Sequence, residues 1–492
     1  ALVSGPAGWM SFNAPTFLFF FLPVSLLAYY AVDRRYKNWV ALAASLVFFA
    51  WGQLYYLPLM LLLIVINYVL GLQIEAGRSQ PDRVRVFLFL GIGLNVVVLL
   101  VFKLATAYGT GWLAFLPSAM QEQMTQTPLP LGLSYVTFQA IAYLIDIYNE
   151  VHDSEKSFLR FALYILLFPK IITGPIVRYR DVAGQLAERA VTAQGAASGA
   201  RRFIVGLAKK ALIADQLARV VNPAFSLAAP NFSTGIAWLA LVGFALQLYF
   251  DFSGFTDMAI GLGQMLGFTF MENFNYPYIS RSISDFWRRW HISLSSWFRD
   301  YVFIPLEFSR RRARYFRQQS NILFVFLLTG LWHGVTLNFI IWGLIHGLAL
   351  ALEMTRFGRW LKNAWPPLQH IYTLGVVLLS WVFFRSTSPG YAGQFLLRLV
   401  GLGPAVQPAA YVDTRPLPII ENSVWLALAL GLLFALPVMP VLRKTWQRLS
   451  RGHALLAGSA RVGTDLLLLA LLVGSVAATV GSTFVASIYG GF

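Results

Sequence analysis

Two histidines stand in the same local frame within an apolar part of the chain. His333 and His346 each occupy the fourth position of Gly-Leu-x-His-Gly, inside the stretch Leu327–Gly347. A neutral histidine in surroundings of low dielectric constant is a suitable general base, able to remove the proton from a hydroxyl as that hydroxyl attacks a thioester. The alternative is a packing histidine, hydrogen-bonded between helices whose glycines permit close backbone contact.

The two histidines differ in their neighbours. If they lie on one continuous helix, thirteen residues at about 100° each place the rings roughly 220° apart, so we expect different surroundings. His333 has polar neighbours in Trp332, Thr336 and Asn338, whereas aliphatic residues surround His346. The pattern favours His333 as the reactive group and a packing role for His346.

A second group of polar residues lies upstream of these histidines. Asp251 and Asp257 interrupt a membrane-like stretch, and further on Arg288, Arg289 and His291 alternate with tryptophans. Ionisable groups at membrane depth are costly and usually line a cavity or pair with each other. The alternative is an interfacial anchoring helix, with Trp and Arg at the lipid headgroups. Anchoring does not require the polar residues that follow at once: Ser293, Ser295, Ser296, Arg299, Asp300 and Tyr301.

Other kinds of active site find no support in the sequence. The stretch Gly261–Gly267 is one residue out of register for a dinucleotide fingerprint, and there is no Walker A loop, H-E-x-x-H or G-x-S-x-G motif. The six histidines contain no i, i+4 pair, so we expect no metal site. The chain has no cysteine, which excludes disulfides, thiolate zinc sites and an acyl-cysteine intermediate on this chain.

Composition indicates the elements that must position these residues. Of the 492 residues 58% are hydrophobic and 12% are charged, whereas a soluble protein carries roughly twice that charged fraction. Continuous apolar runs predict an all-α polytopic membrane protein with about ten to thirteen membrane-embedded helices. The clearest runs are 15–30, 38–51, 54–72, 86–102, 158–172, 234–250, 321–350, 372–384, 424–441 and 466–485, and more polar ones are 131–147, 203–217 and 255–270.

At these residues the chain resembles the membrane-bound O-acyltransferases, in particular the bacterial branch with the alginate O-acetyltransferase membrane subunit and its relatives for cellulose and peptidoglycan. The resemblance runs from near Met10 to about Arg385. It rests on FLFFFLPVSLLAYY, LPLGLSYVTFQAIAYLIDIY, LFPKIITGPIVRYRD, YFDFSGFTDMAIGLGQMLGF, ENFNYPYISRSISDFWRRWHISLSSWFRDYVFIPL, LWHGVTLNFIIWGLIHG and WVFFRS.

The resemblance carries over to individual residues and to the fold. It implies that His333 is the catalytic histidine and that His291 occupies the second active-site position, which is Asn or Asp in some eukaryotic members. The family pattern also includes a histidine at the position of His346, but the resemblance implies no catalytic role for it. The implied fold is a ring of tilted transmembrane helices around a thinned centre with a central tunnel, which would shield a buried histidine from lipid and the donor from bulk water.

The implied acyl donor is acetyl-CoA, a substrate whose phosphates are suited to basic side chains. We expect Arg288, Arg289 and Arg299 to contact it, together with Trp290. Two further candidates for the same contact are Lys170 and Arg178.

The resemblance also implies partners and a location. We expect a multi-pass protein of the bacterial inner membrane that contacts lipid and works with a periplasmic SGNH-hydrolase-like acetyltransferase and polysaccharide-export machinery, with no nucleic acid. For the acceptor we rank alginate or another exopolysaccharide first, cellulose second and peptidoglycan third. A sister enzyme, the D-alanyl transferase for teichoic acid, takes its acyl group from a carrier protein instead.

Two other readings of the sequence stay open at this point. Asp251, Asp257 and the two framed histidines suit a proton-coupled transporter or flippase without chemistry of its own. A scaffold that docks a periplasmic protein is the third reading. For the domains we expect a non-native or processed leader at 1–9, a catalytic membrane core at 10–386, and a loop with C-terminal transmembrane helices at 387–492 that belongs to the same membrane domain.

Charge predicts the orientation in the membrane. The net charge of +17 is concentrated in five segments, GRSQPDRVR, VRYRD, ARRFIVGLAKK, SRRRARYFRQ and RKTWQRLSRGH. Short loops rich in Lys and Arg stay on the cytoplasmic side, so we expect all five segments there.

A single cysteine tests this orientation, because the chain has none of its own. Arg311→Cys should react with a membrane-impermeant maleimide in inside-out vesicles and stay unlabelled in intact spheroplasts. The cysteine-free parent serves as the control for unspecific labelling. Labelling of Arg311→Cys from outside the cell would contradict the predicted topology.

Overall fold

The computed structural model describes residues 10–126, 129–226, 232–312, 316–403, 420–449 and 454–480. Within these ranges all regular structure is helical and no strand occurs, which confirms the predicted all-α class. The expected leader at 1–9 lies outside the described residues, and so do 404–419 and 481–492 of the expected C-terminal part. The division at residue 386 stays a prediction.

The described residues of the first half of the chain form eleven α-helices with two π-helical turns. They are η1 (Phe17–Phe21), α1 (Leu22–Ala31), α2 (Lys37–Ala50), α3 (Leu57–Ala76), α4 (Pro81–Tyr108), α5 (Ser118–Gln126), α6 (Leu133–Tyr148), α7 (Phe158–Leu166), α8 (Phe168–Ile171), α9 (Tyr179–Ala187), α10 (Ala193–Ala208), η5 (Lys209–Ala214) and α11 (Asp215–Ser226).

The described residues of the second half continue the series of helices with a further π-helical turn. They are α12 (Thr234–Met265), α13 (Ile283–Arg289), α14 (Ile292–Phe298), η7 (Arg299–Phe303), α15 (Ile304–Ser309), α16 (Arg317–His333), α17 (Leu337–Glu353), α18 (Arg356–Asn363), α19 (Pro366–Arg385), α20 (Pro389–Leu399), α22 (Asn422–Phe434), α23 (Val438–Leu449) and α24 (Ala454–Val480). Short 3₁₀ turns are η2 (Arg34–Tyr36), η3 (Leu54–Tyr56), η4 (Gly111–Leu113) and η6 (Pro277–Ile279).

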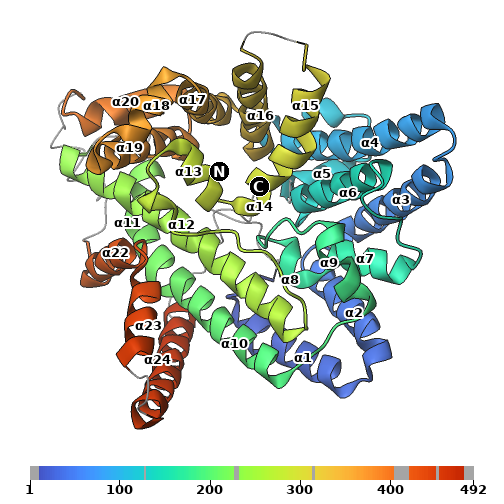
Figure 1. The fold of residues 1–492 in the computed structure, drawn as a ribbon, viewed down its shortest axis with the longest axis horizontal. Helices are drawn as coiled ribbons and strands as arrows, with labels where there is room; N and C mark the ends of the chain where they lie inside the picture. Colours follow the sequence, from blue (N-terminus) through green and yellow to red (C-terminus); the bar gives the residue numbers. More distant parts are fainter. Residues whose placement is uncertain are drawn as a thin grey trace.

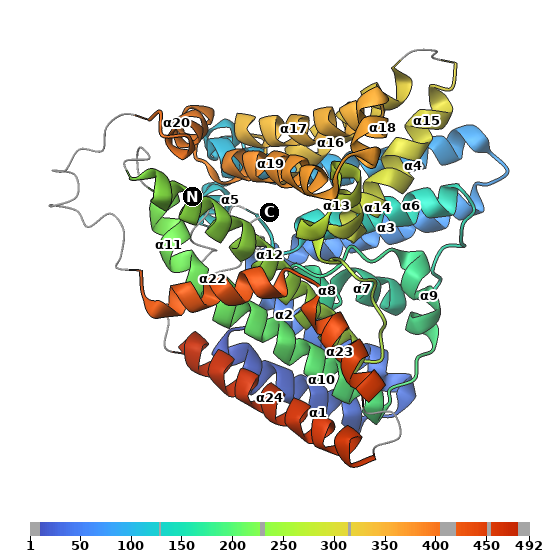
Figure 2. The same ribbon diagram turned by 60° about the vertical axis from the view of Figure 1, so that its left-hand side comes forward.

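The helices are ranged around a centre that holds the short elements α8, α13 and α14. Figure 1 shows α12 running diagonally across the molecule, with α16 to α20 beyond one side of it and α1, α2 and α10 beyond the other. In Figure 2, α24 lies along the outer edge next to α10, and α22 lies beside α11. The C-terminal helices therefore pack on the helices of the expected core.

Fewer helices cross the membrane by length and composition than the apolar runs predict. Among the described residues five helices qualify, or up to seven if the bent pairs α17 with α18 and α22 with α23 each count as one span. Short helices, such as Phe17–Ala31 and Leu133–Tyr148, and helix breaks explain the difference from ten to thirteen. The run 158–172 is divided between α7 and α8 next to Pro169, and the run 321–350 is divided between α16 and α17 at Gly334. Conversely, the runs 234–250 and 255–270 share the single helix α12.

Glycines bring the backbones of α10 and α12 into contact. A Cβ placed on Gly206 would lie 2.5 Å from the carbonyl oxygen of Gly254, and one on Gly199 would lie 2.4 Å from that of Gly261. Small residues at such positions let helices approach closely in a membrane, where no hydrophobic force drives them together. These two contacts fix α12 against α10 over two turns.

Ion pairs that join α12 to α10 and η5 reinforce this contact. The Nζ of Lys210 lies 2.8 Å from Asp251 and 2.6 Å from Asp215, and Asp257 pairs with Arg202 at 2.8 Å and Lys209 at 2.6 Å. The segment ARRFIVGLAKK, expected as a cytoplasmic connector, is thus helical, in α10 and η5. The segment is not a loop because the acids of α12 offer its basic residues partners inside the protein, and its side of the membrane stays a prediction.

Substitution of Lys210 tests the contribution of the buried pairs. Lys210→Met should lower the stability by about 3–5 kcal/mol, because it leaves the carboxylates of Asp251 and Asp215 buried without their cation. The midpoint of thermal unfolding in lipid nanodiscs reports the change, and Lys210→Met combined with Asp251→Asn should recover part of it.

Arg201 provides a matched control for this experiment. Its ion pair with Asp465 is more than half exposed, so Arg201→Met should cost less than about 1 kcal/mol. Equal unfolding midpoints for Lys210→Met and Arg201→Met would show that the buried pairs do not stabilise the fold.

Candidate active site

The apolar stretch with the two histidines forms a helical hairpin. Gly334 has φ 177° and ends α16, and α17 starts at Leu337. A Cβ on Gly330 would lie 2.5 Å from the carbonyl oxygen of Phe339, and one on Gly343 would lie 2.3 Å from that of Phe326. The first glycine of each Gly-Leu-x-His-Gly frame therefore allows the two helices to touch.

The break corrects the expected relation between the histidines. His333 is the last residue of α16 and His346 lies within α17, so the rotation along one continuous helix does not apply. Both rings contact the indole of Trp342, at centroid distances of 4.8 Å for His333 and 5.3 Å for His346. The two rings share Trp342, but their other neighbours differ: Trp332 and Phe384 lie beside His333, and Phe286 and Trp287 lie beside His346.

His346 uses both ring nitrogens to hold helices together. The indole N–H of Trp287 donates to its Nδ1 at 3.2 Å, and its Nε2 lies 2.9 Å from the Oγ of Ser380. Since Nδ1 accepts, the proton of the neutral ring sits on Nε2 and is donated to Ser380. Ser380 in turn donates to the carbonyl of Val377 at 2.7 Å. This arrangement favours a packing role for His346.

His333 is enclosed by aromatic side chains. Its ring lies 4.6 Å from that of Trp332, 4.8 Å from Trp342 and 5.2 Å from Phe384, and the residue is 4% exposed. An imidazole in such low-dielectric surroundings can take up a proton only in a step that compensates for its desolvation. The position therefore suits a base that acts on a bound hydroxyl rather than on bulk water.

His291 is held in place by Asn273, a residue that the sequence did not single out. The backbone of His291 is left-handed, with φ +45°, between α13 and α14. Its Nδ1 lies 3.2 Å from the Oδ1 of Asn273, which also accepts from the N–H and hydroxyl of Ser293 at 3.1 and 2.9 Å. The only local signal for this role was an asparagine in the polar stretch after an apolar run.

Trp332 brings the two predicted catalytic residues together. Its indole contacts the ring of His333 and lies 6.2 Å from the ring of His291. A further neighbour of Trp332 is Lys103, whose Nζ lies 5.8 Å from the centroid of the indole ring. Lys103 belongs to α4 and is 7% exposed, and the sequence analysis missed it because it directly follows the run 86–102.

Two of the expected donor contacts lie on α13 and share one carboxylate. Arg289 pairs with Asp285 at 3.0 Å, and Arg288, whose side chain is 72% exposed, lies 3.8 Å from it. Trp290 is 1% exposed and packs at 5.6 Å on Phe286 and at 5.2 Å on Trp381. Donor contacts by these residues stay predictions, and for Trp290 the structure gives aromatic packing.

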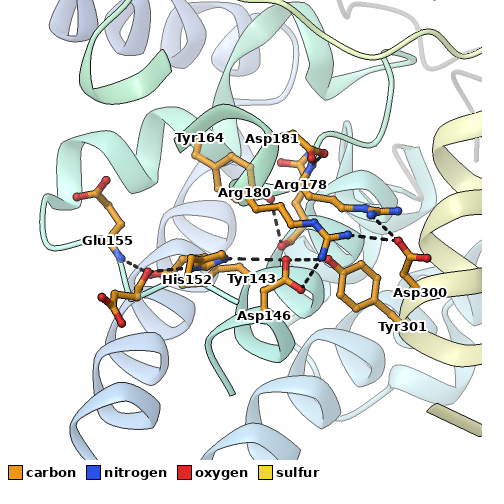
Figure 3. Close-up of polar contacts among 12 residues, drawn as sticks. Tyr143, Asp146, His152, Glu155, Tyr164, Arg178, Arg180, Asp181, Asp300 and Tyr301 are labelled. Atoms are coloured by element: carbon orange, nitrogen blue, oxygen red, sulfur yellow. Dashed lines mark hydrogen bonds and ion pairs between the residues drawn. The ribbon is translucent and has the colours of Figure 1, made fainter. Parts of the chain in front are cut away.

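Arg299 and Arg178 meet at a different carboxylate. Figure 3 shows Arg178 and Arg180 directed at Asp300. The distances to its oxygens are 2.6 Å from Arg178, 3.3 Å from Arg180 and 2.7 Å from Arg299. Partial burial acts to raise the pKa of Asp300, but the hydrogen bond from Arg299 and the charge of Arg178 outweigh it, so the pKa lies below the usual range. The carboxylate is thus ionised and surrounded by three guanidinium groups, which we call the Asp300 cluster.

A second carboxylate connects the Asp300 cluster to α6. Asp146 accepts a hydrogen bond from the hydroxyl of Tyr301 at 2.8 Å and lies 3.5 Å from Arg180 (Figure 3). The other candidate, Lys170, donates a hydrogen bond from its ammonium to Gln139, and the ammonium lies 4.6 Å from the ring centre of Tyr164. Arg178 is the better placed of the two additional candidates.

The chain is similar to known proteins over most of its length. The sequence profile of the membrane-bound O-acyltransferase family matches residues 115–388. The chain is 42% identical over 380 residues to a probable alginate O-acetylase of Pseudomonas aeruginosa, which covers 77% of this chain and 72% of the relative. It is 40% identical over 396 residues to the corresponding protein of Azotobacter vinelandii, with 80% and 79% covered. It is also 36% identical over 428 residues to a peptidoglycan O-acetyltransferase of Helicobacter pylori, with 80% of each covered.

These matches fit the fold and the site. The profile spans both predicted catalytic histidines and the Asp300 cluster, and the helices are those of a multi-pass membrane protein. The expected resemblance is confirmed: the chain is an O-acyltransferase and belongs to the membrane-bound O-acyltransferase family.

Proposed function

We propose that this enzyme transfers an acetyl group from cytoplasmic acetyl-CoA, across the bacterial inner membrane, for O-acetylation of an extracellular or periplasmic polysaccharide. The names of the relatives support an alginate-like exopolysaccharide as the first acceptor, and the Helicobacter pylori relative keeps peptidoglycan as a further one. Cellulose rests on the sequence resemblance alone. A periplasmic SGNH-hydrolase-like acetyltransferase and the export machinery are the proposed partners.

The arrangement of His333 and His291 about Trp332 is the observation that carries this proposal. In the proposed reaction His333 accepts the proton of an acceptor hydroxyl while the hydroxyl oxygen attacks the thioester carbonyl carbon. A C–O bond forms, the C–S bond breaks, and the thiolate leaves and takes up a proton. His291, oriented by Asn273, is the second active-site residue. The aromatic enclosure keeps out water that would hydrolyse the donor.

The Asp300 cluster is the proposed landing site for the donor phosphates. Three guanidinium groups contact the carboxylates of Asp300 and Asp146, and the carboxylate of Asp181 accepts from the backbone N–H of Arg178 at 3.3 Å. Arg178 is only 7% exposed, and among the described residues its Nε and one terminal nitrogen have no hydrogen-bond partner. Buried guanidinium donors of this kind fit phosphate oxygens. We therefore propose that Arg178 and Arg180 contact the donor phosphates together with Arg299.

The charge pattern supports the proposed orientation. Arg178 and Arg180 belong to the basic segment VRYRD, and Arg78 of GRSQPDRVR pairs with Asp153 next to His152 of the same region. Both segments are expected to face the cytoplasm, where acetyl-CoA is made available. The donor would therefore arrive at the Asp300 cluster from the side on which it is found.

The transporter reading loses the observation that favoured it. Asp251 and Asp257 are engaged in ion pairs with Lys210, Arg202 and Lys209, so they stabilise the helices around α12. A proton-coupled pathway requires acids that change partner during transport. The family membership supports chemistry on this chain instead.

Substitution of the framed histidines tests the proposed general base. In nanodiscs, with acceptor and partner supplied, His333→Ala should lower the release of CoA from acetyl-CoA by about 10²–10⁴-fold, the usual contribution of a positioned base. His346→Ala should keep turnover within a few-fold while losing about 1–3 kcal/mol of stability, because it leaves Trp287 and Ser380 without their partner.

The unfolding midpoints of both variants serve as the control for this comparison. A folded His333→Ala that turns over like wild type would exclude His333 as the base. If wild type itself releases no CoA with acceptor and partner present, the acetyl-CoA-dependent reaction is excluded.

Truncated donors test the landing site. Arg178→Gln should raise the KM for acetyl-CoA by about 10-fold or more, since hydrogen bonds to charged groups contribute about 1.5–3 kcal/mol. With acetyl-pantetheine, which lacks the nucleotide and its phosphates, the same variant should match wild type. Arg78→Gln, which removes a surface ion pair with Asp153, is the control and should leave both KM values unchanged. An equal loss with both donors would place the effect of Arg178 outside phosphate binding.

A further inference from the structure

Two buried indoles next to His333 keep hydrogen-bond donors without a use in the fold. Among the described residues the Nε1 atoms of Trp332 and Trp342 have no hydrogen-bond partner, and the residues are 5% and 1% exposed. An indole N–H can only donate, and leaving a buried donor unsatisfied costs about 1–3 kcal/mol. Native proteins contain few such groups, and each calls for an explanation.

Other tryptophans of the same region show that the fold can satisfy indoles where no function prevents it. The N–H of Trp287 donates to His346 at 3.2 Å, and that of Trp297 donates to the carbonyl of Phe138 at 2.9 Å. The N–H of Trp381, by contrast, also has no hydrogen-bond partner among the described residues. Trp332 and Trp342 differ from these in that both contact the ring of His333.

The two indoles approach His333 from different helices. Trp332 belongs to α16 and lies at 4.6 Å with an interplanar angle of 63°, and Trp342 belongs to α17 and lies at 4.8 Å with an angle of 85°. The Gly330 and Gly343 contacts of the hairpin fix the two helices, and with them both indoles, relative to the imidazole. Their N–H groups are therefore set in place before any substrate binds.

A basic side chain adds to the electrostatics of this place. Lys103 lies 5.8 Å from the indole centre of Trp332, is within electrostatic reach of His333, and forms no ion pair in the part of the chain described here. Two indoles thus contact the ring of the base, and one amine lies beside the indole of Trp332. Such a set stabilises negative charge that develops on a bound oxygen.

We propose that the indole N–H groups of Trp332 and Trp342 form the oxyanion site of the acyl transfer. The inference rests on the proposed function, in which an acceptor hydroxyl attacks a thioester carbonyl. As the C–O bond forms and His333 takes the proton, the carbonyl π electrons move onto oxygen, and this oxygen accepts hydrogen bonds from the two indoles. When the C=O bond forms again, the thiolate leaves with the electron pair of the C–S bond and the oxygen loses its negative charge.

Removal of one N–H at a time tests the proposal. Trp342→Phe and Trp332→Phe should each lower kcat by about 10²–10³-fold, the effect of losing one oxyanion donor, while the KM for acetyl-CoA stays within about three-fold. Because a smaller ring can disturb packing, each position should also receive 3-benzothienylalanine, in which sulfur replaces the N–H of an indole-sized ring. These variants should keep the unfolding midpoint and still lose kcat.

Trp297→Phe is the matched control. It removes an indole of the same aromatic region whose N–H is already bound to a backbone carbonyl, so kcat should change by less than about three-fold once the folded fraction is accounted for. The decisive outcomes involve the benzothienyl variants. If both retain wild-type kcat, or if they raise KM with kcat unchanged, the indoles are not oxyanion donors.

The same assays separate this inference from the proposed function. Wild-type turnover that depends on His333 but not on either indole N–H overturns the oxyanion site alone. Absence of acetyl-CoA-dependent turnover in wild type overturns the proposed function and the oxyanion site together.

Discussion

Backbone contact at glycine is the constraint on which the rest of the structure depends. In a membrane the helices gain little from leaving lipid for each other, so close packing must hold them. Gly199, Gly206, Gly254 and Gly261 join α10 to α12, and the framed glycines join α16 to α17. α12 carries the acids that neutralise the basic face of α10 and η5, and it carries Phe252, which meets the ring of His291 edge-on at 4.7 Å. The α16–α17 pair carries both framed histidines.

The two Gly-Leu-x-His-Gly frames therefore have one packing role and two chemical outcomes. The first glycine of each frame allows the backbones of α16 and α17 to touch. The histidines of the two frames differ, because His346 binds Trp287 and Ser380 through its two nitrogens, while the ring of His333 is set among the aromatic rings at the end of α16. A repeated local sequence thus gives a structural residue and a candidate base, according to the helices that each one faces.

The sequence predicted the helical class and the family, because hydropathy and local motifs carry that information, and the catalytic roles of His333 and His291 stay predictions. It did not predict the break at Gly334, since a glycine within an apolar run is compatible with a continuous helix. The sequence also did not predict the contacts of Asn273 and Lys103 or the Asp300 cluster. Each becomes meaningful only through contacts between segments far apart in the chain, such as Arg178 with Asp300 or Lys103 with Trp332. Local patterns report periodicity and caps but not these partners.

The left-handed backbone at residue 291 limits which side chains this position of the chain can accept. With φ +45°, the position tolerates few side chains: glycine costs least, and Asn, Asp and His are the other types found there most often. β-branched residues are strongly disfavoured. Of these permitted types, three bring an imidazole, an amide or a carboxylate to the same place beside Asn273. A mutation to Asn or Asp at this position therefore keeps a polar functional group without a change of the backbone. Mutations to most apolar side chains would strain the backbone and destabilise the fold, whatever their effect on activity.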